Sequence, residues 1–308
     1  MRRVAVALVG ATATGKTAVG ERLAERLHGA VVCADARQVF RELELGTGKP
    51  TPAERAARPH HLFDLLSLAE RASAGRWARA AAAVCEQLFS EGATPVLVGG
   101  SGLYLTAMQR GLHPEPPRDE GLRTRLEQEC ATAGAEAMHA KLATLDAEAS
   151  SRLRPRDRQR VLRALEIVQA GGRPLAWWRA RPRVPPLVAE WRTFELVCSP
   201  QVLTTRIHER TQWIWEAGLL SEVRQLVDAG RGPALRRLAA IGYDEALDVL
   251  AGRLAPEAAR QAISLRTAQL AKRQRTWFRH QLISSALDGT AGPLAPALID
   301  RVLAAVGG

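Results

Sequence analysis

The residues best suited to chemistry stand near the start of the chain, in the stretch VAVALVGATATGKT from Val4 to Thr17. An apolar run leads into the pattern G-x-x-x-x-G-K-[ST], and an amphipathic stretch over residues 17–27 follows it. Glycines at these spacings permit tight turns whose backbone N–H groups surround phosphate oxygens. Lys16 would then reach a terminal phosphate and Thr17 a Mg²⁺ ion, whereas an ordinary glycine-rich turn is the alternative. The predicted phosphate-binding loop comprises Gly10, Ala11, Thr12, Ala13, Thr14, Gly15, Lys16 and Thr17.

Two further candidates stand at the ends of apolar runs. Asp35 ends the run that begins at Ala30, and Ser101 lies in the Gly-Gly-Ser-Gly turn after residues 94–98. Because the carboxyl ends of parallel strands meet at one edge of a sheet, we expect both side chains near the phosphate-binding loop. The chemistry of Asp35 stays open between a functional acid, a helix cap and a Mg²⁺-organising carboxylate. The glycine turn either binds an anion or serves close packing.

The elements that position these residues alternate between strand and helix, which predicts an α/β fold with a parallel sheet flanked by helices. The alternation stops near His113, and residues 118–172 read as helices without a strand. A returning strand is predicted from Thr193. We therefore predict a catalytic core of residues 1–112 and 193–308 and an all-helical insertion of residues 113–192.

The balance of charge is basic. Among 308 residues, 43 Lys and Arg exceed 32 Asp and Glu, which gives a formal net charge of +11. Such an excess either favours a polyanionic partner or only solvates the surface. Five arginines at every second position over residues 152–160, with few acids between them, favour contact with a polyanion. The stretch 272–280 interleaves cations with Trp277 and Phe278, which suits RNA unless these aromatic residues pack inward.

Other features restrict the class of protein. The four cysteines have neither metal-ligand spacing nor the density of a disulfide scaffold, so a reducing compartment is expected and no metal is assigned to them. No uninterrupted apolar run approaches the ~20 residues of a membrane-spanning helix. We expect a cytoplasmic protein that does not enter a membrane. On one face of a predicted helix, Arg206 and Arg210 could form a phosphate clamp.

Taken together, the motifs resemble those of the tRNA dimethylallyltransferases, also called tRNA isopentenyltransferases, in the short bacterial form. The similar segments are GATATGKT at 10–17, DARQVFRELELGTGKP at 35–50, PHHLFD at 59–64, GGSGLY at 99–104, QRVLRALE at 159–166, IGYDE at 241–245 and QLAKRQRTWFR at 269–279. The resemblance covers nearly the whole chain. It implies a P-loop NTPase-like core and the transfer of a dimethylallyl group from dimethylallyl diphosphate to N6 of adenosine 37, in tRNAs that read codons beginning with U.

The resemblance also implies a role for individual residues. Asp35 is the expected base for the N6 proton, while Lys16, Arg210 and Ser101 stabilise the departing diphosphate with Mg²⁺ on Thr17. The insertion is expected to grip the anticodon stem-loop, and the protein is expected to be a monomer. The residues implied to contact tRNA are Asp35, Ala36, Arg37, Gln38, Ser101, Arg123, Gln159, Arg160, Val161, Leu162, Arg163, Lys272, Arg273, Gln274, Arg275, Thr276, Trp277, Phe278 and Arg279.

Three positions depart from the pattern common in that family. Ala36 and Phe40 stand where Ser and Tyr are usual, which removes two side-chain hydrogen bonds, whereas Ser101 replaces Thr and keeps the hydroxyl. Three alternatives remain: a kinase of a nucleoside or small molecule, a prenyltransferase of free adenine nucleotides, and a non-catalytic RNA-binding protein. The kinase leaves the arginine-rich insertion unexplained, and the RNA-binding protein leaves the phosphate-binding loop unexplained.

Overall fold

The chain divides into two compact units in the computed structural model, which describes residues 2–290, 292 and 294–307. The core unit comprises Met1–Gln109 and Pro186–Gly308, and the helical unit comprises Arg110–Pro185. The insertion is therefore shorter than predicted. Its carboxyl-terminal boundary differs because the returning strand begins at Glu190 and pairs with Val4 at the start of the first strand.

A six-stranded sheet forms the centre of the core unit, and its strands are parallel throughout the described residues. The strand order is β3-β2-β4-β1-β5-β6. The strands are β1 (Val4–Gly10), β2 (Ala30–Cys33), β3 (His60–His61), β4 (Pro95–Gly99), β5 (Glu190–Val197) and β6 (Ser285–Asp288). The predicted α/β fold with a parallel sheet is confirmed.

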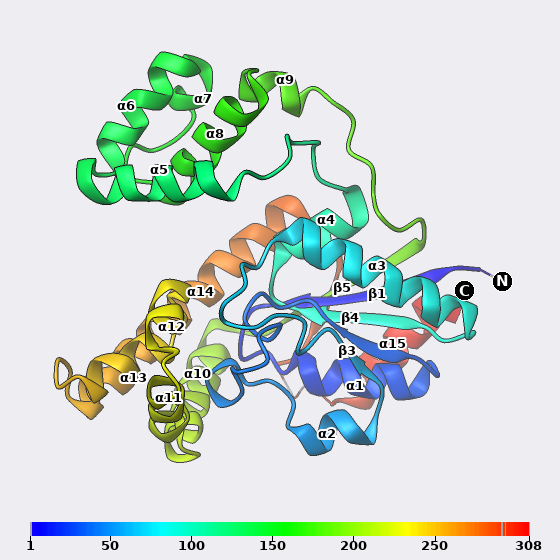
Figure 1. Cartoon of the computed structure of the whole chain (residues 1–308). Helices are drawn as coiled ribbons and strands as arrows, with labels where there is room; N and C mark the ends of the chain where they lie inside the picture. The colour runs from blue at the N-terminus through cyan, green and yellow to red at the C-terminus, as the bar shows by residue number, and fades with distance from the viewer. Residues whose placement is uncertain (1, 291, 293, 308) are drawn as a thin grey trace. The chain divides into compact units, whose positions relative to one another are not determined.

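Helices cover both faces of this sheet, with α3 and α4 on one side and α1 and α15 on the other (Figure 1). The helices of this unit are α1 (Lys16–Arg26), α2 (Pro52–Ala57), α3 (Ala74–Ser90), α4 (Gly102–Arg110), α10 (Pro200–Glu216), α11 (Leu219–Asp228), α12 (Gly232–Leu238), α13 (Tyr243–Leu250), α14 (Pro256–Gln281) and α15 (Pro296–Gly307), with a 3₁₀ turn η1 (Leu45–Thr47). Because both faces are covered, the central strands are apolar throughout rather than alternating. Val6, Leu8 and Leu97 are completely buried.

The sheet order places the candidate residues at one edge. β1 lies between β4 and β5, and β4 lies between β1 and β2. Val9 is level with Gly99 of β4, and Cys33 is level with Val98. The loops that follow β1, β2 and β4 therefore leave the sheet side by side, which is where ligands bind in parallel sheets.

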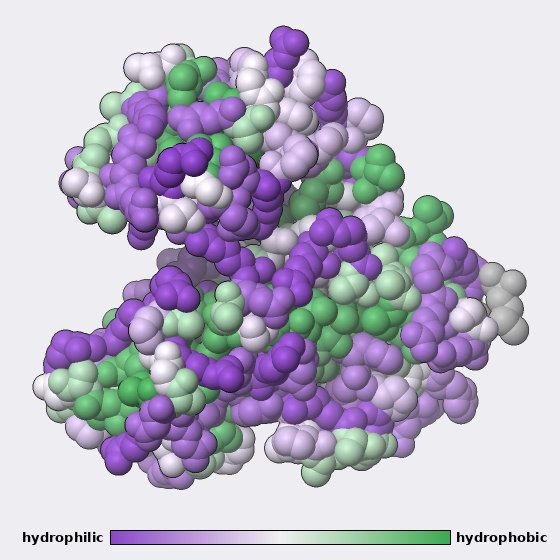
Figure 2. All heavy atoms as spheres, in the orientation of Figure 1, coloured by the Kyte–Doolittle hydropathy of each residue, from purple (hydrophilic) through white to green (hydrophobic). Residues whose placement is uncertain are grey.

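The helical unit has a core of its own, with Leu126, Leu142 and Leu165 at most 1% exposed. Its helices are α5 (Glu120–Ala133), α6 (Ala135–Leu145), α7 (Ala147–Ser151), α8 (Arg158–Gly171) and α9 (Leu175–Arg179). Figure 2 shows hydrophilic residues over much of its visible face, with smaller apolar patches between them. Across the part of the chain that the structure describes, no helix is long and apolar enough to span a membrane.

Candidate active site

The loop after β1 has the backbone shape that its glycines predicted. Gly15 adopts φ 92° immediately before α1, a left-handed conformation that favours glycine. A Cβ atom on Gly10 would lie 2.6 Å from the carbonyl oxygen of Leu196, so only glycine fits beside β5. Thr14 closes the turn, with its hydroxyl donating to the Ala11 carbonyl at 2.9 Å. The N-terminus of α1 follows directly, with Lys16 and Thr17 in its first turn.

Lys16 is a buried cation with an unusual pKa. Its ammonium donates to the Ala11 carbonyl at 3.0 Å and so connects the two ends of the phosphate-binding loop. Burial lowers its pKa to about 8, Asp35 opposes that shift, and Arg210 adds to it. Burial also lowers the pKa of Arg210, again opposed by Asp35. One carboxylate is therefore surrounded by two cations that have lost part of their hydration, an arrangement that attracts a polyanion.

Asp35 uses one of its two carboxylate oxygens locally. Its Oδ1 accepts from the backbone N–H of Arg37 at 2.8 Å and of Gln38 at 3.4 Å. Among the hydrogen bonds of the described residues, none involves its Oδ2. The helix-cap interpretation is wrong, because residues 36–39 form a turn rather than a helix; one oxygen of Asp35 closes that turn, and the second is available as a base or a metal ligand.

Ser101 joins the two turns that follow β2 and β4. Its Oγ accepts from the Ala36 N–H at 2.8 Å, and its own N–H donates to the Ala34 carbonyl at 3.2 Å. Because this contact uses the hydroxyl as an acceptor, the O–H proton remains for a ligand. The absence of a hydroxyl at Ala36 does not affect this contact, since Ala36 takes part through its backbone.

The two arginines of α10 hold different backbone segments. Arg206 donates to the Thr14 carbonyl at 3.3 Å and to the Gly289 carbonyl at 3.0 Å, so it fixes the phosphate-binding loop to the end of β6. Arg210 donates to the Thr47 carbonyl at 2.9 Å. The predicted clamp therefore has one arginine that shapes the loop and a second that lies among the site's charges.

Gln274 of α14 also binds the loop. Its Oε1 accepts from the Thr12 N–H at 2.9 Å, and its Nε2 donates to the Gly100 carbonyl at 3.0 Å. The side chain thus bridges the phosphate-binding loop and the glycine turn after β4. We had predicted a tRNA contact for Gln274, and the structure gives its amide group an internal role.

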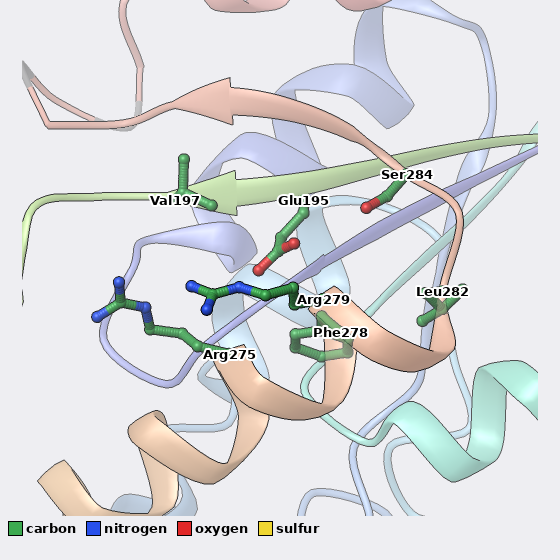
Figure 3. Close-up of a pocket in the computed structure, with 7 residues that line it drawn as sticks. All are labelled: Glu195, Val197, Arg275, Phe278, Arg279, Leu282 and Ser284. Atoms are coloured by element: carbon green, nitrogen blue, oxygen red, sulfur yellow. The ribbon is translucent and has the colours of Figure 1, made fainter.

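The carboxyl-terminal end of α14 forms a cavity of about 260 Å³ with β5. Figure 3 shows Glu195 pointing from β5 toward α14, from which Arg275 and Arg279 extend. Burial raises the pKa of Glu195, and the two arginines oppose this. Phe278 is only 1% exposed and lies edge-to-face against Trp277, with ring centroids 5.7 Å apart. The inward packing of Phe278 removes it as a stacking platform for RNA bases.

The arginine run of the helical unit has more acidic partners than its sequence indicated. Arg152 pairs with Glu148, Arg156 with Glu136 and Arg160 with Asp157, at 2.6, 2.8 and 3.2 Å. Glu148 lies one helical turn before Arg152, whereas Glu136 comes from α6, 20 positions before Arg156, and both lie outside residues 152–160. These pairs lie at the surface, with the Arg160 side chain 75% exposed, so each contributes little to stability.

Arg123 and Arg163 have a different role from the exposed arginines. Both contact the buried carboxylate of Glu166, at 3.0 and 2.7 Å. Arg163 also pairs with Glu115. Breaking such a buried group of charges is costly, so these two side chains stabilise the helical unit.

The remaining predicted tRNA contacts divide by exposure. Val161 and Leu162 are buried in the core of the helical unit, at 0% and 2% exposure, so their side chains do not reach a ligand at the surface. The exposed side chains are Arg37, Gln159, Arg160, Lys272, Arg273, Thr276 and Arg279.

Sequence reasoning assigned no role to Tyr104, although it ends the GGSGLY motif. Its ring stacks on Trp77 with centroids 4.6 Å apart, and Trp77 donates to the Cys33 carbonyl at 2.7 Å. Within the described part of the chain, the Tyr104 hydroxyl is buried without a hydrogen-bond partner. Burial raises its pKa, and nearby Asp35 adds to the effect. The two alternatives for this motif, anion binding and close packing, concern its glycines and Ser101, and neither points to the Tyr104 hydroxyl.

Comparisons with known proteins agree with this arrangement. A model of the IPP transferase family matches residues 38–281. The tRNA dimethylallyltransferase of Bradyrhizobium sp. (strain ORS 278) is 40% identical over 280 residues, which cover 90% of this chain and 91% of that protein. That of Stenotrophomonas maltophilia (strain K279a) is 40% identical over 290 residues, with 91% of each chain covered.

Solved structures extend the likeness to three dimensions. The tRNA isopentenylpyrophosphate transferase of Bacillus halodurans has a TM-score of 0.70 and 32% identity, covering 99% of this chain and 96% of its own. A tRNA delta(2)-isopentenylpyrophosphate transferase of Staphylococcus epidermidis has a TM-score of 0.71 and 27% identity, with 99% of each chain covered. The chain belongs to the IPP transferase family.

Proposed function

We propose that this protein transfers a dimethylallyl group from dimethylallyl diphosphate to N6 of adenosine 37 in tRNAs that read codons beginning with U. The observation that carries the proposal is the group of charges formed by Lys16, Arg210 and Asp35 beside the phosphate-binding loop. Two cations suit a diphosphate leaving group, and one carboxylate suits the proton that leaves the amine. A kinase would leave the exposed arginines of the helical unit, such as Arg156 and Arg160, unexplained.

In this reaction the N6 nitrogen attacks the allylic carbon, and the carbon–oxygen bond to the diphosphate breaks. The exocyclic amine is a poor nucleophile because its lone pair is delocalised into the purine ring. Positioning and proton removal must therefore carry much of the catalysis. Asp35 Oδ2 accepts the N6 proton, while Lys16, Arg210 and the loop N–H groups hold the charge that grows on the leaving oxygens. The Ser101 hydroxyl donates to the same oxygens.

Mg²⁺ fits the oxygen donors that this site offers, namely the Thr17 hydroxyl and the Asp35 oxygen that does not cap the turn. Hard oxygen ligands are those that Mg²⁺ prefers, and it keeps waters and substrate phosphates as its other ligands. When bound, Mg²⁺ would neutralise part of the diphosphate charge. Because Asp35 Oδ2 accepts the N6 proton in this proposal, Thr17 is the residue that would hold Mg²⁺.

The tRNA partner is expected to bind through its anticodon stem-loop. A base stacked in that loop must be extruded to reach a site at the edge of a sheet, which costs a few kcal/mol. Exposed arginines of the helical unit, such as Arg156 and Arg160, suit the phosphates of the stem. We further propose that the protein works as a monomer in the cytoplasm, where its substrates are.

One experiment separates the candidate functions. The protein is incubated with Mg²⁺ and radiolabelled dimethylallyl diphosphate, together with total tRNA, AMP or ADP. We expect label on tRNA alone, and digestion should place it on the adenosine beside the anticodon. Label on free nucleotide without label on tRNA would overturn the proposal, as would phosphate transfer from γ-labelled ATP to a nucleoside.

A further inference from the structure

The IGYDE segment and helix α11 lie against residues 42–48, which we call the anchored loop. This loop follows the turn that carries Asp35 and Gln38, and it includes η1. Helices α10, α11 and α13 each contact a different residue of this loop. Among the predicted site residues, Arg210 and Gln38 contact this loop, and the function proposed above leaves the IGYDE segment without a role.

Glu222 of α11 supplies the central contact. Its Oε1 accepts from the Glu44 N–H at 2.9 Å, and its Oε2 accepts from the Leu45 N–H at 2.9 Å. The Tyr243 hydroxyl donates to Oε1 at 2.6 Å and holds the carboxylate in this orientation. Both oxygens of the Glu222 carboxylate therefore accept hydrogen bonds, from two backbone N–H groups and one phenol. Hydrogen bonds to a charged carboxylate are stronger than those between neutral groups.

Close packing fixes the loop against the same helices. A Cβ atom on Gly46 would lie 2.3 Å from a ring carbon of Tyr243, and Tyr243 is 0% exposed. A Cβ atom on Gly48 would likewise lie 2.3 Å from the Arg210 guanidinium. The backbone at Gly46 and Gly48 thus lies so close to the Tyr243 ring and the Arg210 guanidinium that a side chain at either position would collide with them.

The opposite side of the loop is held by a buried lysine. The Lys49 ammonium donates to the Phe40 carbonyl at 2.7 Å and contacts Asp64 at 3.0 Å and Glu44 at 3.4 Å. Glu44 is therefore fixed through its side chain by Lys49 and through its backbone by Glu222. With both sides fixed, the carbonyls at the end of the loop have little freedom to move.

Those carbonyls connect the anchored loop to the reacting groups. Thr47 accepts from Arg210 at 2.9 Å and from Gln38 Nε2 at 3.2 Å, and Gly48 accepts from Gln38 at 3.0 Å. Gln38 in turn donates its backbone N–H to Asp35. Arg210 directly, and Asp35 through Gln38, are thus both linked to the Thr47 carbonyl, and Gln38 is also bound to the Gly48 carbonyl.

We propose that Glu222 and Tyr243 are positioning residues that set the anchored loop, and through it orient Arg210 toward the diphosphate and Asp35 toward the amine. This inference rests on the proposed function. The two residues touch no substrate; they act through the Thr47 and Gly48 carbonyls. Loosening the loop should therefore impair capture of dimethylallyl diphosphate more than binding of tRNA.

The test uses Tyr243→Phe and Glu222→Gln in the full-length protein. The first keeps the ring against Gly46 and removes one hydrogen bond, and the second replaces one acceptor oxygen by an N–H donor that faces a backbone N–H. Asp248→Asn is the matched control, since Asp248 lies on α13 with Tyr243 and its replacement breaks ion pairs with Arg236 and Arg253 that do not contact the loop.

The KM for dimethylallyl diphosphate, the Kd for tRNA and the rates of hydrogen exchange are measured for each protein. For both loop variants we expect the KM for dimethylallyl diphosphate to rise about tenfold, with the Kd for tRNA unchanged. Hydrogen exchange of peptides that contain Glu44 and Leu45 should accelerate in the same variants and remain unchanged in the control. A purely structural role would instead lower the melting temperature and the active fraction without raising this KM.

The outcomes distinguish the inference from the proposed function. If the wild-type protein labels tRNA but the variants match its KM and its exchange rates, the positioning role is wrong. If the wild type labels no tRNA, the proposed function fails, and the exchange experiment still decides whether Glu222 and Tyr243 hold the loop.

Discussion

Replacing Lys16 with Met should stabilise the folded protein at neutral pH while it abolishes transfer. Burial lowers the pKa of Lys16 from 10.5 to about 8. Each pKa unit corresponds to about 1.4 kcal/mol, so the charged ammonium costs the folded state roughly 3 kcal/mol. Met has a similar length and no charge to desolvate, so Lys16→Met should recover a large part of this free energy.

The sign of the effect fixes its dependence on pH. Between pH 8 and 10.5 the unfolded chain keeps the Lys16 proton while the folded chain has lost it. Because the unfolded state binds more protons there, wild-type stability rises with pH by about 1.4 kcal/mol per unit. Above the ordinary pKa the penalty is absent, and it returns in full as the pH falls through about 8. The advantage of Lys16→Met should therefore be greatest at pH 7 and should shrink toward pH 10.

Denaturant unfolding followed by circular dichroism at pH 7, 8, 9 and 10 measures this difference. Lys272→Met is the control, since Lys272 is exposed on α14. At each pH, the free energy of unfolding of the wild type is subtracted from that of each variant, which cancels the titration of the tyrosines and cysteines that all three proteins share. An advantage of Lys16→Met that stays constant from pH 8 to 10, or that equals the advantage of the control, would refute the buried-cation argument.

Three further predictions follow from the contacts described above. Asp35→Ala should reduce transfer by at least ~10²-fold and keep tRNA affinity, as expected for loss of a general base; near wild-type turnover in a single-turnover assay would contradict that role. Arg160→Ala should weaken tRNA binding and reduce the slope of log K against log salt by about one, whereas Arg253→Ala in the core unit should leave the slope unchanged; equal slopes in filter binding would argue against a phosphate contact. Tyr104→Phe should stabilise the protein by about 1–3 kcal/mol, because it removes a buried hydroxyl without a partner; a lower unfolding midpoint would show that this hydroxyl is satisfied.

The sequence was sufficient to predict the parts of the site that depend on local pattern. The glycine spacing and the helix after it predicted the loop from Gly10 to Thr17, because each feature is encoded within a few residues. Asp35 and Ser101 could be placed at the same edge, since every parallel strand ends there. The structure bears out this arrangement through the hydrogen bond between Ser101 and Ala36.

Contacts between distant segments could not be predicted in this way. Glu222 meets Glu44 across 178 positions of the chain, and no local pattern marks a carboxylate that will accept two backbone N–H groups. β6 is not predicted, because a four-residue strand has too little alternation to stand out. The inward packing of Phe278, one of the two alternatives that the sequence leaves open, likewise depends on the sheet beside it, which residues 272–280 alone do not encode.

The electrostatics of the site also determine how its variants must be interpreted. Asp35 opposes the loss of charge on both Lys16 and Arg210, so Asp35→Ala removes a base and also weakens a cation. The pH dependence separates these effects. Loss of the base lowers kcat at every pH. In the wild type, the KM for dimethylallyl diphosphate should rise above about pH 8, because Lys16 loses its proton there. In Asp35→Ala the pKa of Lys16 falls further, so this rise in KM should begin at a lower pH. A KM profile for Asp35→Ala that coincides with the wild-type profile would mean that the carboxylate does not stabilise the charge on Lys16.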